Sequence, residues 1–114
     1  MGKFLVLYNS QMSAAEVMAS STPEEMKAGM DAWMAWGGKV GDALVDFGMP
    51  LGVSKHLEGG SVADSSNPAS GYSILQADSL EAAAGLLEDH PHLTVPGNTI
   101  DVLEFLPMPG MGME

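Results

Sequence analysis

Residues 3–8, Lys3-Phe4-Leu5-Val6-Leu7-Tyr8, are the stretch that decides the fold. Their composition predicts a β-strand whose even-numbered side chains, from Phe4 to Tyr8, point to one face. The odd-numbered leucines, Leu5 and Leu7, point to the other face. An antiparallel strand with one face in water would alternate apolar with polar residues, and this one does not. We therefore expect a second layer of structure on each face of the strand.

The strongest helix signal begins at Thr22-Pro23-Glu24-Glu25. Thr22 can cap the helix, Pro23 suits its first position, and Glu25 can reach back to the cap amide. Apolar residues then recur at spacings of three and four, which predicts one buried stripe: Met26, Met30, Trp33, Gly37, Val40, Leu44 and Phe47. We expect a helix over residues 23–47, ended by Gly48 and Pro50, with Met26, Met30 and Met34 in its core.

The other segments predict shorter elements. Polar and small residues over 9–21 form a connector that contains a short helical turn from Ser13. Strands are expected at 49–57, 72–77 and 100–106, and a Gly- and Ser-rich loop or ragged hairpin at 58–70. The capping sequence Asp78-Ser79-Leu80-Glu81 opens a second helix that runs to about Glu88. The tail over 107–114, with Met108, Met111 and Met113, is expected to be frayed or docked on a partner.

These elements follow the order βαββαβ within a single domain over 1–114. The order predicts an α+β, ferredoxin-like fold: a four-stranded antiparallel sheet with both helices on one face. The helices cover one face of the 3–8 strand, and Leu5 and Leu7 remain bare on the other. Burying that face against a second copy is the simplest solution, so we expect a homodimer that packs sheet against sheet.

The charge balance excludes several partners. Four Lys, no Arg and 15 acidic residues give a net charge of −11. Nucleic acids and anionic membranes attract basic surfaces, so neither is an expected partner. The chain has no Cys, which excludes disulfides and thiolate metal sites. No stretch has the length of a signal peptide or a membrane span, and a cytoplasmic location is the default expectation.

Several segments resemble YCII-related proteins. The resemblance rests on Lys3–Tyr8, Thr22–Met26, Gly71–Ile74 with Ala77–Ala83, and His90-Pro91-His92-Leu93 followed by Thr99–Val102. It covers residues 3–106 in the right order. It implies the dimeric α+β barrel fold, in agreement with the topology predicted from the elements.

The resemblance also implies a candidate site. Members of the family are suspected enzymes, some with a His at the start of the first helix near an Asp that precedes a Pro. Glu25 and His90 hold these positions here, with the two residue types exchanged. His90 would then be the acid/base and Glu25 its orienting partner, holding the imidazole in its protonated form. His92 could take the same role. The implied reaction is cofactor-free isomerase- or lyase-type chemistry on a small apolar molecule.

Other interpretations of the same residues stay open. Glu25 could simply complete the capping box with Thr22. His90 and His92 could bind a metal together with Glu25 or Asp31, although His-x-His alone is a weak signal and no metal is expected. The second function is a non-catalytic small-molecule-binding or regulatory module. Catalysis requires that His90 face a pocket with a carboxylate within hydrogen-bond reach.

Aromatic residues predict the ligand pocket between the sheet and the helices. We expect Tyr8 to provide its polar group and Trp33 and Tyr72 to line it, with His56 at its rim. Trp36 lies off the core stripe and is a candidate for a rim or dimer contact. The chain has no Gly-rich phosphate loop and no nucleophile motif, and no cofactor is expected. Haem or flavin binding would rest on fold analogy alone.

Overall fold

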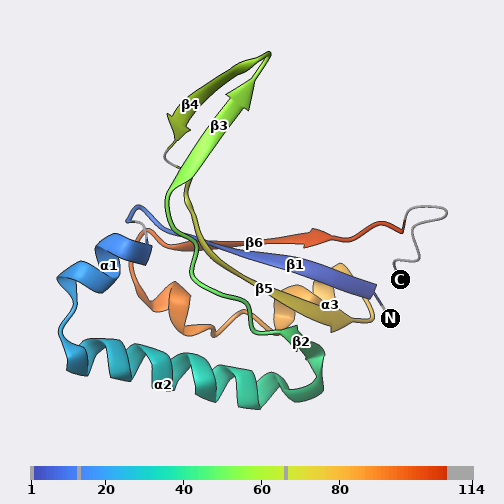
Figure 1. Ribbon diagram of the computed structural model, residues 1–114. Helices are drawn as coiled ribbons and strands as arrows, with labels where there is room; N and C mark the ends of the chain where they lie inside the picture. The colour runs from blue at the N-terminus through green and yellow to red at the C-terminus, as the bar shows by residue number, and fades with distance from the viewer. Residues whose placement is uncertain (1, 13, 66, 108–114) are drawn as a thin grey trace.

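A computed structural model of the protein describes residues 2–12, 14–65 and 67–107. Figure 1 shows its helices and strands in chain order. They are β1 (Gly2–Asn9), α1 (Ala14–Ser20), α2 (Pro23–Val40), the 3₁₀ turn η1 (Gly41–Ala43), β2 (Leu44–Asp46), β3 (Ser54–Glu58), β4 (Ser61–Ser65), β5 (Ala69–Ala77), α3 (Leu80–Gly85), the 3₁₀ turn η2 (Pro91–Thr94) and β6 (Thr99–Glu104).

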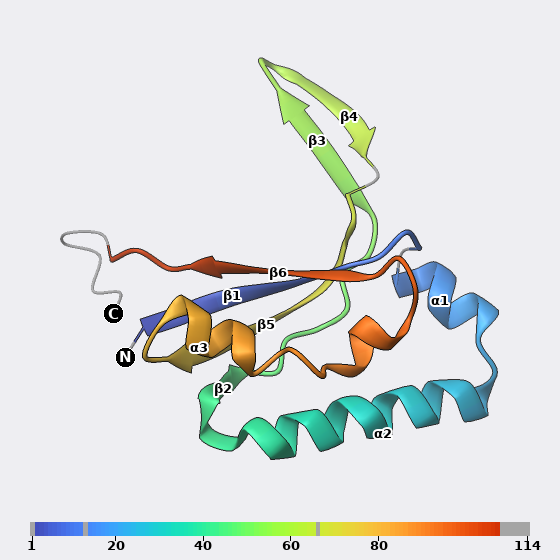
Figure 2. The same ribbon diagram turned by 180° about the vertical axis from the view of Figure 1, so that it is seen from behind.

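Four strands form one antiparallel sheet in the order β2-β5-β1-β6. The strand predicted over 3–8 is β1, and it lies between β5 and β6. Helices α2 and α3 lie on the same side of this sheet in both views (Figures 1 and 2). The prediction of an α+β fold with a four-stranded antiparallel sheet is confirmed, and the arrangement is compatible with a ferredoxin-like fold.

The core lies between the sheet and the helix layer. Phe4, Val6 and Tyr8 of β1 are buried, as the alternation of β1 predicts. Leu75 of β5 joins them in the sheet. The helix side of the core includes Trp36 of α2, Ala83 of α3 and Leu87, which follows α3. The prediction that Trp36 lies at a rim or dimer contact is wrong, because its side chain is only 4% exposed and its Nε1 donates to the Leu86 carbonyl at 2.9 Å.

The opposite side of the sheet, which we call the open face, carries the other side chains of the three long strands. Leu5 pairs with Ile74 of β5 and with Leu103 of β6, and Leu7 pairs with Tyr72. Partners in register point to the same side of a sheet. All five side chains are partly buried or exposed. Within the described residues, no helix covers this face.

Helix α2 ends earlier than predicted, at Val40 instead of residue 47. Gly41 follows with a positive φ of 57°, a conformation that favours glycine and turns the chain out of the helix. Leu44 then pairs with Leu75 as part of the edge strand β2. Leu44, in the strand, and Phe47, in the loop that follows it, both still pack on the core. Helical spacing therefore identified core residues whose local structure was set by pairing with β5.

Gly48 has a different role from the predicted helix stop. It has a φ of 80°, and a Cβ added there would lie 1.7 Å from the carbonyl oxygen of Tyr72. The chain that leaves β2 thus crosses the backbone of β5 at a distance that only glycine allows.

The first half of α2 extends beyond the sheet. The capping box predicted at Thr22 and Glu25 is confirmed. However, Met26, Met30 and Met34 are all more than 40% exposed, so their predicted place in the core is wrong. The apolar stripe continues along this half of the helix, but its methionine side chains face water.

The segment between β2 and β5 forms a projecting hairpin of β3 and β4, paired in register. The strand predicted over 49–57 is confined to Ser54–Glu58, and the loop predicted over 58–70 contains β4. The short helical turn in the connector is confirmed as α1. Helix α3 ends at Gly85, before the predicted Glu88. Of the predicted tail, residues 108–114 lie outside the described residues.

In the described part of the chain, no helix is long and apolar enough to cross a membrane.

Candidate functional site

Five aromatic rings meet at one end of the helix layer. Tyr8 comes from β1, Trp33 and Trp36 come from α2, and His90 and His92 flank Pro91 at the start of η2. The ring centre of His90 lies 4.4 Å from that of Trp36, 4.5 Å from that of Trp33 and 4.8 Å from that of Tyr8. We call this group the aromatic–histidine cluster. It occupies the space where the sequence predicts a ligand pocket.

His90 is fully buried in this cluster, with 0% of its surface exposed. It is the N-cap residue of η2, and its Nδ1 accepts a hydrogen bond from the backbone N–H of His92 at 2.9 Å. Pro91 has no N–H, so the amide of His92 is the first donor that this turn offers. An accepting Nδ1 carries no proton, which places the proton of the neutral ring on Nε2.

The Nε2 atom of His90 is buried and has no hydrogen-bond partner within the described residues. The rings of Trp33 and Trp36 are steeply inclined to the imidazole.

Burial also lowers the pKa of His90, to about 4, with a smaller contribution from the neighbouring His92. Removing an imidazolium from water disfavours the charged form. The expectation that Glu25 holds His90 in its protonated form is therefore wrong: the ring is neutral at pH 7.

Glu25 lies at the exposed start of α2. Its Oε1 accepts the backbone N–H of Thr22 at 2.8 Å, and its own N–H donates to the Thr22 hydroxyl at 3.1 Å. Hydrogen bonding of the carboxylate to the Thr22 backbone N–H, and secondly to the Thr22 side chain, lowers the pKa of the Glu25 carboxyl. Within the described residues no hydrogen bond or ion pair joins Glu25 to His90. The capping interpretation is the one that the structure shows.

His92 is also nearly buried, and it connects three segments. Its Nε2 contacts the carbonyl oxygen of Asn9 at 2.8 Å, and Asn98 donates to its carbonyl oxygen at 3.3 Å. These bonds tie η2 to the end of β1 and to the turn before β6. They are the contacts of a structural histidine.

Tyr8 faces the core instead of a ligand site. Its hydroxyl donates to Ser73 Oγ at 2.9 Å, and Ser73 Oγ donates to the Phe47 carbonyl at 2.7 Å. Burial raises the pKa of Tyr8 to about 12, although the bond to Ser73 partly opposes the shift. Ser73 was not identified from the sequence, because a serine in a strand carries no signal of a buried partner 65 positions away.

The other two predicted ligand residues lie elsewhere. Tyr72 pairs with Leu7 and therefore projects from the open face, away from the helix layer. His56 lies on the projecting hairpin, where its exposed ring contacts Glu58 at 3.1 Å. Neither residue joins Tyr8 and Trp33 in a common pocket.

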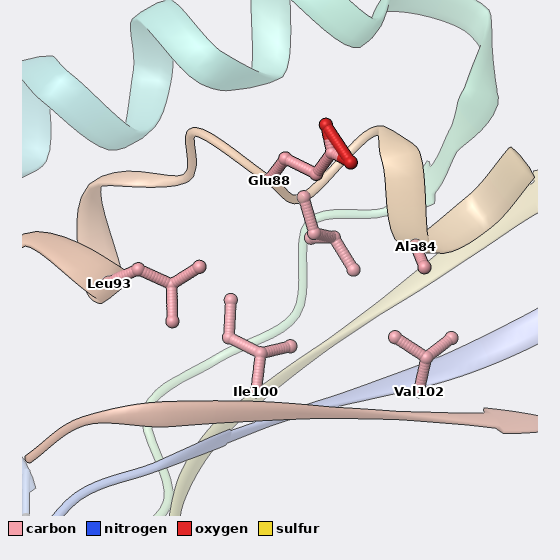
Figure 3. A pocket seen from close by; sticks show the side chains of 6 residues that line it. Ala84, Glu88, Leu93, Ile100 and Val102 are labelled. Atoms are coloured by element: carbon pink, nitrogen blue, oxygen red, sulfur yellow. The ribbon is translucent and has the colours of Figure 1, made fainter. Parts of the chain in front are cut away.

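The structure has an apolar hollow that the sequence did not predict, between β6 and the segment that follows α3. Its volume is about 240 Å³. Figure 3 shows Ile100 and Val102 rising from β6 toward the segment that carries Ala84 and Glu88. The hollow is lined by Ala84, Leu87, Glu88, Leu93, Ile100 and Val102, of which Glu88 is the only charged residue.

No group of three His, Asp or Glu side chains is placed to hold a metal ion within residues 2–12, 14–65 and 67–107. His90 and His92 approach each other, but Nδ1 of His90 and Nε2 of His92 are both engaged by the backbone. The alternative of a metal on this pair, completed by Glu25 or Asp31, gains no support from the geometry.

The sequence matches no model of a known protein family, and no curated protein sequence is significantly similar to it. The resemblance to YCII-related proteins therefore stays a prediction.

Proposed function

We propose that the protein is a homodimeric, ferredoxin-like module of the YCII-related kind that binds a small, mostly apolar molecule without catalysis by His90. The environment of His90 carries this proposal. Its imidazole is buried and uncharged at neutral pH, and it accepts a hydrogen bond from the backbone of His92. A general acid or base must come within hydrogen-bond distance of the proton that it transfers, and the buried Nε2 of this ring is closed off from a substrate in this structure.

The chemistry of the hollow supports the choice of ligand. Five of its six lining residues are apolar, and the sixth, Glu88, brings a carboxylate. A volume of about 240 Å³ suits a molecule with a single ring. A ring that carries an ammonium group would match both features, because its apolar part fills the hollow and its charge can pair with Glu88.

The open face supports the homodimer. Leu5, Leu7, Tyr72, Ile74 and Leu103 form a continuous group across three strands with no covering layer in the described residues. Apolar patches of this kind on a small domain mark interaction surfaces. Packing two such faces buries them in an isologous, two-fold arrangement.

Ligand titrations followed by methyl NMR test the proposal. The probes are benzylamine, benzyl alcohol and benzoate, which share a ring and differ in charge. We expect benzylamine to shift the methyl signals of Leu93, Ile100 and Val102 most strongly, followed by benzyl alcohol, whereas benzoate has little effect. Glu88→Gln should remove the preference for the amine. Glu81→Gln, on the exposed first turn of α3, is the matched control and should keep it.

If none of the three probes shifts these methyl signals at tens of millimolar, the hollow is not a binding site and the proposal fails. Shifts that are confined to other parts of the molecule would have the same meaning.

Cofactor-free proton transfer by His90 is the second candidate function, favoured by its buried Nε2, which finds no hydrogen-bond partner in the part of the chain that the structure describes. It requires an opened state in which a substrate reaches that atom. The test is deuterium exchange at the α-carbon of small ketones in D₂O, with wild type and His90→Asn. We expect both proteins to match the buffer rate. Exchange by the wild type that His90→Asn abolishes would replace the binding proposal with the enzymatic one.

A further inference from the structure

The β3–β4 hairpin rises on the side of the sheet opposite α2 and α3 in both views (Figures 1 and 2). It therefore stands on the same side as the open face. Leu57 and Val62 are paired across its two strands, and they are 70% and 65% exposed. Directly paired residues share one face of a hairpin, so these two side chains form a single apolar spot near its tip.

The polar contacts of the hairpin are mostly internal. Lys55 pairs with Asp64, His56 contacts Glu58, and Ser54 Oγ donates to the Ser65 carbonyl. An isolated two-stranded hairpin is at best marginally stable in water. Packing on another polypeptide chain would stabilise this projecting hairpin and bury its apolar spot.

The charges on the open face indicate that this partner is a second copy. Lys3 stands at one end of this face, and Asp101, bound by Asn9 Nδ2 at 2.8 Å, stands at the other. The remaining three lysines pair with Asp31, Asp64 and Asp89, whereas Lys3 has no ion pair within the described residues. A two-fold axis perpendicular to the strands would place each Lys3 opposite Asp101 of the other copy.

The overall charge limits where two copies can meet. Two chains of net charge −11 repel each other over most of their surfaces. Among the side chains of β1, β5 and β6 that face this side, Lys3 and Asp101 are the charged ones, and they cancel. The further carboxylate of Asp46, which pairs with Ile74, lies on the edge strand β2, outside this central part. The open face is therefore a surface on which two acidic copies can approach.

We propose that the β3–β4 hairpin is an arm that lies along the flank of the second copy and buries Leu57 and Val62 against it. This inference rests on the proposed homodimer and adds a second contact to it, outside the sheet-to-sheet interface.

Sedimentation equilibrium and hydrogen exchange test the arm. The variants are Leu57→Ser/Val62→Ser, the control His56→Ser on the opposite hairpin face, and Leu5→Asp on the open face. We expect a wild-type dimer whose hairpin amides become protected as dimer forms. The double variant should raise the dimer dissociation constant at least about tenfold and lose that protection, the control should match wild type, and Leu5→Asp should be monomeric.

The outcomes separate the two proposals. A wild type that is monomeric at all concentrations overturns the dimer and the arm together. A wild-type dimer whose dissociation constant is unchanged by Leu57→Ser/Val62→Ser, with hairpin amides equally exposed at every concentration, overturns the arm and leaves the dimer. Protection of the hairpin only when another protein is added also overturns the arm.

Discussion

His90 and His92 are joined by a hydrogen bond in which the backbone N–H of His92 donates to Nδ1 of His90 at 2.9 Å. This bond fixes the tautomer of a ring that is fully buried among Tyr8, Trp33 and Trp36. A residue type usually associated with acid/base chemistry therefore acts here as a helix cap and a core side chain.

Stability should fall as the pH is lowered through the range between the two pKa values of His90. The pKa is about 4 in the folded protein and about 6.5 in the unfolded chain. Below pH 6.5 the His90 side chain binds a proton in the unfolded chain but stays unprotonated in the folded protein. Acid therefore favours unfolding. The loss should approach roughly 3 kcal/mol near pH 4. Urea denaturation at a series of pH values measures it.

His90→Asn is the control for this titration. Asn can still accept the amide of His92 as an N-cap residue, but it does not titrate. Its curve should be flatter than that of wild type between pH 6.5 and 4, after the carboxylates common to both proteins are subtracted. Parallel curves would mean that His90 is not the group responsible.

Ser73→Ala should destabilise the protein more than Tyr8→Phe. Ser73 accepts from Tyr8 and donates to Phe47, so its removal leaves a buried hydroxyl and a carbonyl without partners. We expect a cost of about 2–3 kcal/mol, against about 1 kcal/mol for Tyr8→Phe, which leaves the Ser73–Phe47 bond intact. Free energies of unfolding for both variants decide the order, and a larger cost for Tyr8→Phe would contradict it.

Gly48→Ala should be far more damaging than Gly60→Ala. Both glycines have a positive φ, 80° and 88°, but only Gly48 lies against backbone, where a Cβ would meet the Tyr72 carbonyl oxygen. The expected cost is roughly 3 kcal/mol or more at Gly48 and about 1–2 kcal/mol at Gly60. Thermal unfolding compares them. Similar melting temperatures would show that the crossing over β5 adapts easily.

Reversing one charge on the open face should weaken the proposed dimer, and reversing both should restore it. Lys3→Asp would set two acidic groups against each other in the antiparallel arrangement, and Lys3→Asp/Asp101→Lys would reinstate opposite charges. We expect the dimer dissociation constant to rise and then recover, by sedimentation at low salt. If the single reversal has no effect, the strands of the two copies are arranged differently.

Sequence pattern predicted most of the fold because its strongest signals are local. These signals are the two-sided apolar strand at 3–8, the capping box at Thr22 and the order of the main elements, and each depends on neighbours in the chain. At the second helix Ser79 caps alone, because its third helical residue is Ala82 and not Glu81. The extent of α2 did not follow from pattern. Leu44 and Phe47 fit a helical stripe, but pairing with β5 moved them into a strand and a loop, and Gly41 made the exit possible.

The site was harder to predict because it depends on packing. His90, Tyr8 and Trp33 do come together, as the sequence predicted, but they fill the space between them instead of lining it. Glu25 caps the start of its own helix by accepting the backbone N–H of Thr22, as the capping pattern indicates. Apart from Glu88, the hollow is made of ordinary apolar residues from α3, the segment after it, η2 and β6, which carry no sequence signal of a ligand.

The central claim is that His90 is a structural residue of a binding module. Histidine NMR of the wild type and of Glu25→Gln tests this claim most directly. Long-range ¹H–¹⁵N spectra across a pH series report the tautomer and the pKa of each ring. The account predicts that the His90 proton stays on Nε2, with a pKa near 4 that is the same in both proteins. A His90 pKa above its usual value that falls in Glu25→Gln would contradict the account and restore the acid/base pair.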